Sequence, residues 1–258
     1  MTVLIHSTAV VDPECELGTD VEIGPYAVLG PAVEIGDGCR VGPHAVLERN
    51  VRLAEEVTIG AGTVLGAPPQ DLKFRGEETW VEIGPRSVIR EHSTVNRATT
   101  ATAVTRIGAD CFLMTYVHVA HDCQIGDGVS IANATQLSGH VTIESNATLS
   151  GLIAIHQFVT IGGYAFVGGA SRVNQDIPPF VKAVGNPVEL FGLNTVGLQR
   201  AGFGTEALAG LKHAYRLLFN SALSRAEALA HLESEAGQCA EVRRLIAFVG
   251  AARRGIPA

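Results

Sequence analysis

Residues 107–173 read IGADCFLMTYVHVAHDCQIGDGVSIANATQLSGHVTIESNATLSGLIAIHQFVTIGGYAFVGGASRV. Every sixth residue of this stretch, from Ile107 to Val173, is Ile, Leu or Val. The same phase reaches back to Ile5, and 26 of its 29 positions are aliphatic; the exceptions are Asp71, Glu77 and Ala101. Neither the helical period of 3.6 residues nor the strand period of 2 gives this spacing, which is that of a hexapeptide repeat.

The repeat predicts a mainly β protein, a parallel β-helix, over residues 1–176. Each hexapeptide forms one short strand and a turn, and three of them complete a triangular coil of about 18 residues. The aliphatic residue points into the prism, and successive coils lie about 4.8 Å apart, the strand spacing of a sheet. Four of the five Cys (Cys15, Cys39, Cys111 and Cys123) stand two residues before an aliphatic position. We therefore expect them to be small buried side chains and not nucleophiles.

Two interruptions keep the phase of the repeat, at about residues 67–80 and 98–105, and are predicted to be loops that project from the solenoid. Long loops in a compact domain are usually functional. The repeat ends near Val173, and residues 177–258 are predicted to form a helical domain that caps the open end. Helical segments are expected at Thr205–Asn220, after a Ser224–Glu227 capping box, and at Cys239–Ala252.

Composition narrows the function classes. The chain has 258 residues, with 47% hydrophobic, 17% charged and a net charge of −7. These values are typical of a globular protein and give no reason to expect a nucleic-acid partner. A membrane-spanning helix needs roughly 20 consecutive apolar residues, and no apolar run approaches that length, so none is expected. An odd number of widely spaced Cys favours a reducing compartment, and we expect the protein to be cytoplasmic.

The charge is uneven along the chain. Residues 1–176 contain 10 Lys and Arg against 20 Asp and Glu, whereas residues 177–258 contain 9 against 6. The C-terminal part, with a net charge of +3, is therefore expected to meet anions, either phosphate ligands or an acidic protein. A solvated helical surface would explain the charge equally well. The cations of a docking surface for an acidic protein would include Lys212, Arg216, Arg243 and Arg244.

Histidines mark the candidate site. Because each coil takes three hexapeptides, His121, Gly139 and Gln157 should stack in one column, with Asp122 and His140 in the next. His118 and His156 fall close to these columns on their own coils. Three chemistries remain open on the residues alone: a zinc site like that of the γ-class carbonic anhydrases, a structural or ice-binding solenoid, and acyl transfer with a His base. The spacing His118–Val–Ala–His121 is shorter than that of the paired zinc ligands in the γ-class carbonic anhydrases. A structural or ice-binding solenoid needs flat ladders of Thr on one face, which this sequence lacks.

Six stretches carry a more specific resemblance: GAPPQDLKF, VHVAHDCQIG, SGHV, AIHQF, GNPVELFGLN and GLQRAGF. In this order they resemble the UDP-N-acetylglucosamine acyltransferases that begin lipid A biosynthesis, over essentially the whole chain. The resemblance implies a left-handed solenoid and a homotrimer with active sites between subunits. It also implies transfer of a 3-hydroxyacyl group from acyl carrier protein to the sugar 3-hydroxyl, without metal, cofactor or acyl-enzyme, the 4′-phosphopantetheine arriving on acyl carrier protein.

Site roles are carried over by motif. His121 is similar to the family's general base, with Asp122 orienting it and the Gly139 N–H as the oxyanion donor. The remaining positions resemble substrate contacts: Gln70, Asp71, Lys73, His118, His140, Gly151, His156, Gln157, Asn194 and Arg200. Gly169 matches the position that measures acyl-chain length, and Gly151 should stack on it near the catalytic edge.

Two positions depart from the family pattern. Ala201 stands where a second basic residue is common after the Arg, and Pro187 stands where some members have a His. Both concern binding of the uridine diphosphate. The related N-acyltransferase, which acts later in the pathway, carries an N-terminal uridine-binding domain, and the hexapeptides here start at Ile5. Acetyl-CoA-dependent hexapeptide transferases would not explain the QDLKF loop. The sequence leaves open the preferred chain length and a 3-hydroxyl or 3-amino acceptor.

Overall fold

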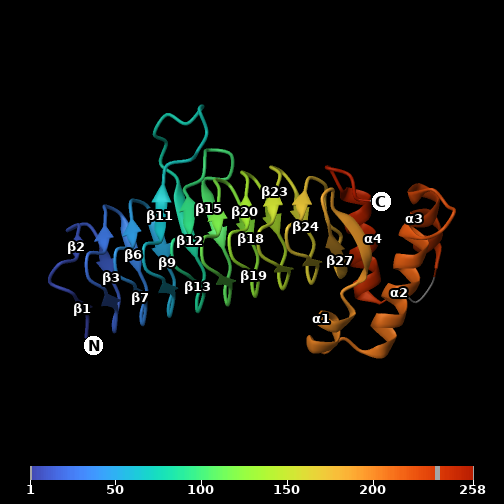
Figure 1. Cartoon of the computed structure of the whole chain (residues 1–258), viewed down its shortest axis with the longest axis horizontal. Helices are drawn as coiled ribbons and strands as arrows, with labels where there is room; N and C mark the ends of the chain where they lie inside the picture. Colours follow the sequence, from blue (N-terminus) through green and yellow to red (C-terminus); the bar gives the residue numbers. More distant parts are fainter. Residues whose placement is uncertain (1, 236–238, 258) are drawn as a thin grey trace.

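The computed structural model describes residues 2–235 and 239–257, and most of them wind into a parallel β-helix. Figure 1 shows the solenoid lying horizontally, with the helices gathered at its C-terminal end. Three sheets, here named A, B and C, form the sides of the prism, and the chain visits them in turn in every coil. The predicted architecture is confirmed.

Sheet A holds eleven strands within the described residues: β1 Leu4–Ile5, β4 Glu22–Ile23, β7 Arg40–Val41, β10 Thr58–Ile59, β13 Val88–Ile89, β16 Phe112–Leu113, β19 Ser130–Ile131, β22 Thr148–Leu149, β25 Phe166–Val167, β27 Val181–Val184 and β28 Glu189–Leu193. Sheet B contains β2 Val10–Val11, β5 Val28–Leu29, β8 Val46–Leu47, β11 Val64–Ala67, β14 Thr94–Asn96, β17 His118–Val119, β20 Gln136–Leu137, β23 Ala154–Ile155 and β26 Arg172–Val173. Sheet C contains β3 Glu16–Leu17, β6 Val33–Ile35, β9 Val51–Leu53, β12 Trp80–Ile83, β15 Val104–Ile107, β18 Gln124–Ile125, β21 Thr142–Ile143 and β24 Thr160–Ile161.

The register explains the period of six. Ile125 pairs with Ile143 on the next coil, three hexapeptides later, and both are buried. Across the first interruption Leu65 pairs with Val95, and across the second Val95 pairs with Val119. The first of these offsets exceeds one coil by two hexapeptides, and the second exceeds it by one. The inward aliphatic column therefore continues unbroken through the core.

Both interruptions project from the same edge of the prism, as Figure 1 shows above β11 and β15. They comprise residues 68–79, here named loop 1, and residues 97–103, loop 2, and each connects sheet B to sheet C. We refer to this edge as the B–C corner. The bounds agree closely with the predicted loops.

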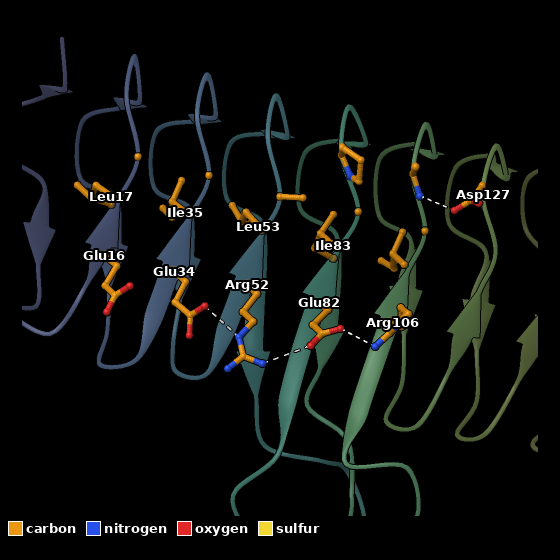
Figure 2. Close-up of a pocket in the computed structure, with 18 residues that line it drawn as sticks. Glu16, Leu17, Glu34, Ile35, Arg52, Leu53, Glu82, Ile83, Arg106 and Asp127 are labelled. Carbon is orange, nitrogen blue, oxygen red and sulfur yellow. Dashed lines mark hydrogen bonds and ion pairs between the residues drawn. The ribbon is translucent and has the colours of Figure 1, made fainter. Parts of the chain in front are cut away.

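A ladder of charged side chains lines the outer face of sheet C (Figure 2). The Arg52 guanidinium lies 3.0 Å from the Glu34 carboxylate and 3.3 Å from that of Glu82, and Arg106 lies 2.7 Å from Glu82. Arg52 also lies 3.7 Å from the centroid of the Trp80 ring. Each ion pair joins neighbouring coils, so the sheet C ladder links the coils on the outer surface of the prism. The aliphatic column packs them together on the inside.

The C-terminal part departs slightly from expectation. Residues 177–194 were predicted to lie in the helical domain, but β27 pairs in parallel with β25 and continues sheet A, and β28 pairs with β27 in antiparallel. The reason is that Ala183, although out of the hexapeptide phase, takes the buried place next to Val167.

The helices follow as α1 Thr195–Arg200, α2 Thr205–Phe219, α3 Arg225–Ser234 and α4 Ala240–Ala251. The Ser224–Glu227 capping box is confirmed. α1 was not predicted from the sequence. Apolar faces of the helices pack around Phe180, Leu211 and Leu245 and close this end of the core. Among the described residues, no helix is long and apolar enough to cross a membrane.

Candidate active site

The turns of two adjacent coils meet at the B–C corner. His121 and Asp122 lie in the turn between β17 and β18, and Gly139 and His140 lie in the equivalent turn between β20 and β21. The His140 backbone N–H donates to the His121 carbonyl across 3.0 Å. The stacking predicted from the length of the coil is therefore confirmed.

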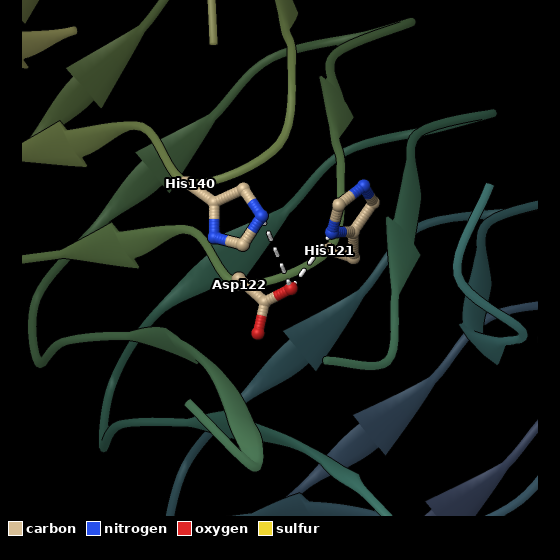
Figure 3. Close-up of side chains that lie close together, drawn as sticks. All are labelled: His121, Asp122 and His140. Carbon is tan, nitrogen blue, oxygen red and sulfur yellow. Dashed lines mark hydrogen bonds and ion pairs between the residues drawn. The ribbon is translucent and has the colours of Figure 1, made fainter. Parts of the chain in front are cut away.

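A histidine–aspartate pair forms the centre of this corner (Figure 3). His121 Nδ1 lies 2.7 Å from Asp122 Oδ2, and His140 Nε2 lies 3.8 Å from the same oxygen. The Asp122 side chain is fully buried and that of His121 is 12% exposed. Because the Asp122 carboxylate accepts a hydrogen bond from Nδ1–H of His121, Nε2 of the neutral ring keeps a lone pair for a substrate proton.

Loop 2 holds the aspartate in place. The Thr102 hydroxyl donates to Asp122 Oδ1 at 2.6 Å, and the Thr99 hydroxyl donates to Oδ2 at 2.8 Å. The backbone N–H groups of both threonines also donate to this carboxylate. Burial raises the pKa of Asp122, but hydrogen bonds from Thr102, His121 and Thr99 outweigh it and lower the pKa below its usual value. The carboxylate therefore stays charged beside His121.

Gly139 lies directly against the His121 ring. A Cβ at this position would stand 2.6 Å from Cε1 of His121 and 2.7 Å from its Nε2, so any larger residue here would displace the His121 ring. The Gly139 N–H donates to no carbonyl among the described residues. Earlier coils carry proline at the equivalent position of this corner, at Pro13 and Pro31, because an N–H here has no partner within the coil. An available backbone donor thus lies beside the His121 ring.

His118 lines a shallow groove on sheet B that loop 1 also reaches. Its Nδ1 lies 2.7 Å from the Thr94 hydroxyl, and burial, together with the charge of His121, lowers its pKa. Gln70 from loop 1 lines the same groove. The other lining residues are His92, Thr94, Tyr116, Ala134 and Gln136. The structure thus brings together Gln70 and His118, two of the candidate substrate contacts.

The other loop 1 candidates lie farther out. The Asp71 carboxylate accepts the Lys73 backbone N–H at 2.9 Å, which shapes the tip of the loop. Lys73 is exposed. Arg97 supports the base of the loop, because its Nε donates to the Gly66 carbonyl at 3.0 Å and its guanidinium lies 5.7 Å from the Phe74 ring.

The C-terminal side of the corner is formed by β23 and the turn after it. The His140 ring stacks on Phe158 at 4.5 Å between centroids, and Gln157 stands in the His121–Gly139 column, one coil on. His156 precedes it and is exposed. Apart from Gly151, the candidate residues from His118 to Gln157 therefore lie at or beside one edge of the molecule.

The two ruler glycines do not lie at this corner. Gly151 and Gly169 stack as predicted, since a Cβ on Gly169 would lie 3.2 Å from the Gly151 carbonyl. They follow β22 and β25, however, and so stand at the corner between sheets A and B. The prediction that Gly151 and Gly169 lie near the catalytic edge is therefore wrong within one chain. Gly139 and Gly151 are two hexapeptides apart, and a full coil takes three, so the two glycines lie at different corners of the triangle.

Asn194 and Arg200 also lie away from His121 in the single chain. Asn194 caps α1 through Gly197 N and donates to the Tyr164 carbonyl at 3.0 Å, and Arg200 is exposed in the last turn of α1. Figure 1 shows α1 on the edge opposite the two loops. Sheet A, from which this segment continues, is the side of the prism facing away from the B–C corner.

Cysteine and metal chemistry fit the corner less well than a histidine base. Burial raises the pKa of Cys123 to about 12, so its thiol stays protonated and inert. His121, Asp122 and His140 offer three ligand atoms within 4.8 Å of one another. Both Asp122 oxygens, however, already accept hydrogen bonds from Thr99, Thr102 or His121, which occupy the lone pairs a metal would need.

Sequence reasoning missed the side chains that hold the site together. Thr99 and Thr102 were hidden in a segment recognised only as a loop, although its Thr-rich stretch Thr99–Thr100–Ala101–Thr102 was a usable signal. Thr105, whose hydroxyl accepts the Asp122 N–H at 2.9 Å, gave no signal of its own. Of the cations expected on the C-terminal surface, Arg244 is paired with Glu144 at 2.7 Å and holds α4 against the solenoid.

Comparison with known proteins gives the family. Residues 176–257 match the family described as UDP-N-acetylglucosamine O-acyltransferase, domain 2. Residues 14–49, 32–67 and 105–139 match the bacterial transferase hexapeptide family. Two relatives named acyl-[acyl-carrier-protein]–UDP-N-acetylglucosamine O-acyltransferase are similar over nearly their whole length. The relative from Sulfurihydrogenibium sp. is 56% identical over 98% of this chain and 93% of its own, and that from Syntrophobacter fumaroxidans is 45% identical over 98% of each.

Solved structures agree with the sequence relatives. A UDP-N-acetylglucosamine acyltransferase from Bacteroides fragilis superposes with a TM-score of 0.97 at 38% identity, covering 99% of this chain and 100% of its own. A structure of the same family from Acinetobacter baumannii has a TM-score of 0.95 at 40% identity, with the same coverage. The fold is thus the left-handed β-helix that the family resemblance implies. The chain belongs to the acyl-[acyl-carrier-protein]–UDP-N-acetylglucosamine O-acyltransferase family.

Proposed function

We propose that this chain transfers a 3-hydroxyacyl group from acyl carrier protein to the 3-hydroxyl of UDP-N-acetylglucosamine, the first step of lipid A biosynthesis. The family supports the reaction, since the relatives are named for it. The observation that carries the mechanism is the His121 Nδ1–Asp122 Oδ2 contact of 2.7 Å with the Gly139 N–H beside the same ring.

The proposed step is direct transfer. Nε2 of His121 takes the proton of the sugar hydroxyl as its oxygen attacks the thioester carbonyl, and Asp122 stabilises the imidazolium that forms. The Gly139 N–H holds the oxyanion of the tetrahedral intermediate. When the intermediate collapses, the C–S bond breaks and the pantetheine thiolate takes the proton from His121. No cofactor is needed beyond the 4′-phosphopantetheine that arrives on acyl carrier protein.

Residues remote from the corner are proposed to serve a neighbouring subunit. Asn194, Arg200, Gly151 and Gly169 lie on other sides of the prism, so a homotrimer with intersubunit sites would bring them to a partner's catalytic corner. In that arrangement Arg200 meets the pyrophosphate. The sugar nucleotide and the pantetheine are positioned by the candidates on the B–C corner and its loop: Gln70, Asp71, Lys73, His118, His140, His156 and Gln157. A cytoplasmic location follows from these two substrates.

Acyl carrier protein is proposed to dock on α2. Lys212 and Arg216 border a groove whose other lining residues include Leu193, Leu208 and Tyr215. Both cations are exposed. An apolar floor with a cationic rim suits an acidic protein whose prosthetic group must enter a narrow site.

The test is an acyl-transfer assay on the purified protein with 3-hydroxyacyl carrier protein thioesters of several chain lengths. UDP-N-acetylglucosamine and its 3-amino analogue serve as competing acceptors, and a parallel reaction contains EDTA. We expect 3-O-acylated product at a rate that EDTA leaves unchanged. Absence of product at every chain length, or loss of the rate with EDTA, would refute the proposal; preference for the amino sugar would make the enzyme an N-acyltransferase.

The same panel tests Gly169. Gly169→Met should move the preferred chain to shorter lengths, because each methylene left unburied costs about 0.8 kcal/mol, roughly fourfold in relative rate. A Cβ at this position needs the Gly151 carbonyl to move only slightly, so the variant should fold. An active variant with an unchanged profile would place the ruler elsewhere.

A further inference from the structure

The C-terminal segment after α4 returns to the last coils of the solenoid, where residues 253–255 meet Asp176. Asp176, which is 2% exposed, accepts the backbone N–H groups of Arg253 at 2.9 Å and Arg254 at 3.0 Å. The Asp176 N–H donates in return to the Gly255 carbonyl at 2.8 Å. A buried carboxylate thus holds the segment 253–255 against the end of the B–C corner.

The Arg254 side chain makes hydrogen bonds at this corner. Arg254 Nη2 lies 3.1 Å from Nδ1 of His156 and 3.3 Å from the Asn174 carbonyl. Its Nε is buried and has no hydrogen-bond partner among the described residues. The guanidinium therefore contacts His156 while one of its own donors stays unsatisfied, a cost that a side chain serving only to anchor the segment would avoid.

The contact with Arg254 favours one tautomer of the His156 ring. A guanidinium donates hydrogen bonds and accepts none, so in this hydrogen bond Nδ1 presents its lone pair to Arg254 and the ring proton sits on Nε2. Nδ1 also lies 3.1 Å from the Gln157 carbonyl, a contact that would favour a proton on Nδ1. The two neighbours of Nδ1 thus select opposite tautomers, and the charged donor is the stronger partner.

We propose that Arg254 is a positioning residue that holds His156 in the Nε2–H tautomer, so that His156 donates a hydrogen bond to an oxygen of the sugar nucleotide. His156 stands one residue before Gln157, which continues the column of His121 and Gly139. The inference rests on the proposed function, because it gives a role to a residue placed beside the acceptor sugar. It makes the last residues of the chain part of the acyl-transfer site.

The direct test is nitrogen NMR of the full-length enzyme labelled at histidine, with the His156 signals identified by their loss in His156→Gln. Wild type should show a neutral ring protonated at Nε2. In Arg254→Ala the Gln157 carbonyl remains the partner of Nδ1, so the proton should move to Nδ1. Arg254→Lys keeps a cationic donor and should restore the wild-type tautomer. Arg253→Ala is the matched control and should change nothing, because the segment stays bound through the backbone.

Activity gives the second readout. Arg254→Ala should lower kcat/KM for UDP-N-acetylglucosamine roughly tenfold, and Arg254→Lys should recover most of it. In His156→Gln the side-chain amide lies near the place of the histidine Nε2–H and needs no contact with Arg254 to act as a donor. Adding Arg254→Ala to this variant should therefore lower kcat/KM little further. An Nδ1–H tautomer in wild type, or an Nε2–H tautomer in Arg254→Ala, overturns the role of Arg254. A changed tautomer with full activity in both single variants overturns instead the role of His156 in the proposed function.

Discussion

The sheet C ladder and the B–C corner are both built from charged side chains stacked on successive coils, yet they differ in exposure and in pairing. In the ladder, Arg52 and Glu34 are each 42% exposed and neutralise each other. At the corner, Asp122 is fully buried and its histidine keeps one ring nitrogen unpaired by the carboxylate. The same repeat therefore carries stabilising ion pairs on the face of sheet C and a reactive histidine at the B–C corner. The two clusters differ because the Asp122 carboxylate is covered by other groups, whereas the charges of the ladder are exposed.

Loop 2 supplies that cover. An uninterrupted coil would leave the corner turn facing solvent, as the exposed corner residues Tyr26 and Leu152 do elsewhere. The extra hexapeptide brings Thr99 and Thr102 over the Asp122 carboxylate instead. Insertion of whole hexapeptides adds these groups without disturbing the aliphatic column, so function is added while the core stays intact.

The largest effect is expected at His121. His121→Ala should lower kcat roughly 100-fold or more, the scale of losing a general base, while circular dichroism and oligomeric state stay unchanged. The matched change in the ladder, Arg52→Ala, should keep the wild-type rate. Near-normal turnover by purified His121→Ala would place the base elsewhere.

Thr102→Val removes one donor to Asp122 and nearly preserves shape. We expect about a tenfold lower kcat and a free energy of unfolding lower by about 1–3 kcal/mol, measured by urea denaturation. The acid sensitivity should change too. Since folding lowers the pKa of Asp122, its carboxylate stabilises the fold above the unfolded pKa of about 3.9, and that contribution is lost as pH falls through the folded value. With one donor fewer, the loss should begin at higher pH.

Thr142→Val on β21 is the control for this variant, because Thr142 makes no side-chain hydrogen bond among the described residues. Its rate, stability and acid midpoint should match the wild type. Equal behaviour of the two variants would mean that loop 2 does not support the aspartate.

The α2 surface should show a smaller effect. Lys212→Glu combined with Arg216→Glu should raise the KM for acyl carrier protein several-fold at low salt and leave kcat unchanged. The difference from wild type should shrink as salt rises, because exposed charges are screened within about 8–10 Å. Arg40→Glu, on sheet A near the opposite end of the solenoid, is the control. An unchanged KM in the α2 variant would move the docking surface elsewhere.

The smallest effect belongs to the ladder. Arg52→Ala breaks ion pairs with Glu34 and Glu82, but exposed pairs contribute little, so we expect the free energy of unfolding to fall by about 1 kcal/mol or less. Thermal denaturation with the acyl-transfer rate would check this. If the free energy of unfolding fell as much as in Thr102→Val, the exposed ion pairs of the ladder would contribute as much as the buried contacts of Asp122, which would contradict this account.

The solenoid was predictable because every hexapeptide has the same local structure. Ile125 and Ile143 repeat the same environment, so spacing alone predicted the fold, the stacking of His121 on Gly139 and the positions of both loops. The contacts of Asp122 with Thr99 and Thr102 were not predictable, because loop 2 lies outside the repeat and the period does not give the positions of its residues. The corner at which Gly151 and Gly169 lie could have been read from the same count, since residues that are not a whole number of coils apart face different sides.

One measurement tests the central claim that Asp122 and His121 act as a unit at this corner: the double-mutant cycle of His121→Ala and Asp122→Asn, with kcat measured for all four proteins. Groups that act together are strongly non-additive in such cycles. Asp122→Asn alone should lower kcat by an amount close to that of His121→Ala, and the double variant should be no slower than His121→Ala. Losses that multiply in the double variant would show that the aspartate does not act through His121.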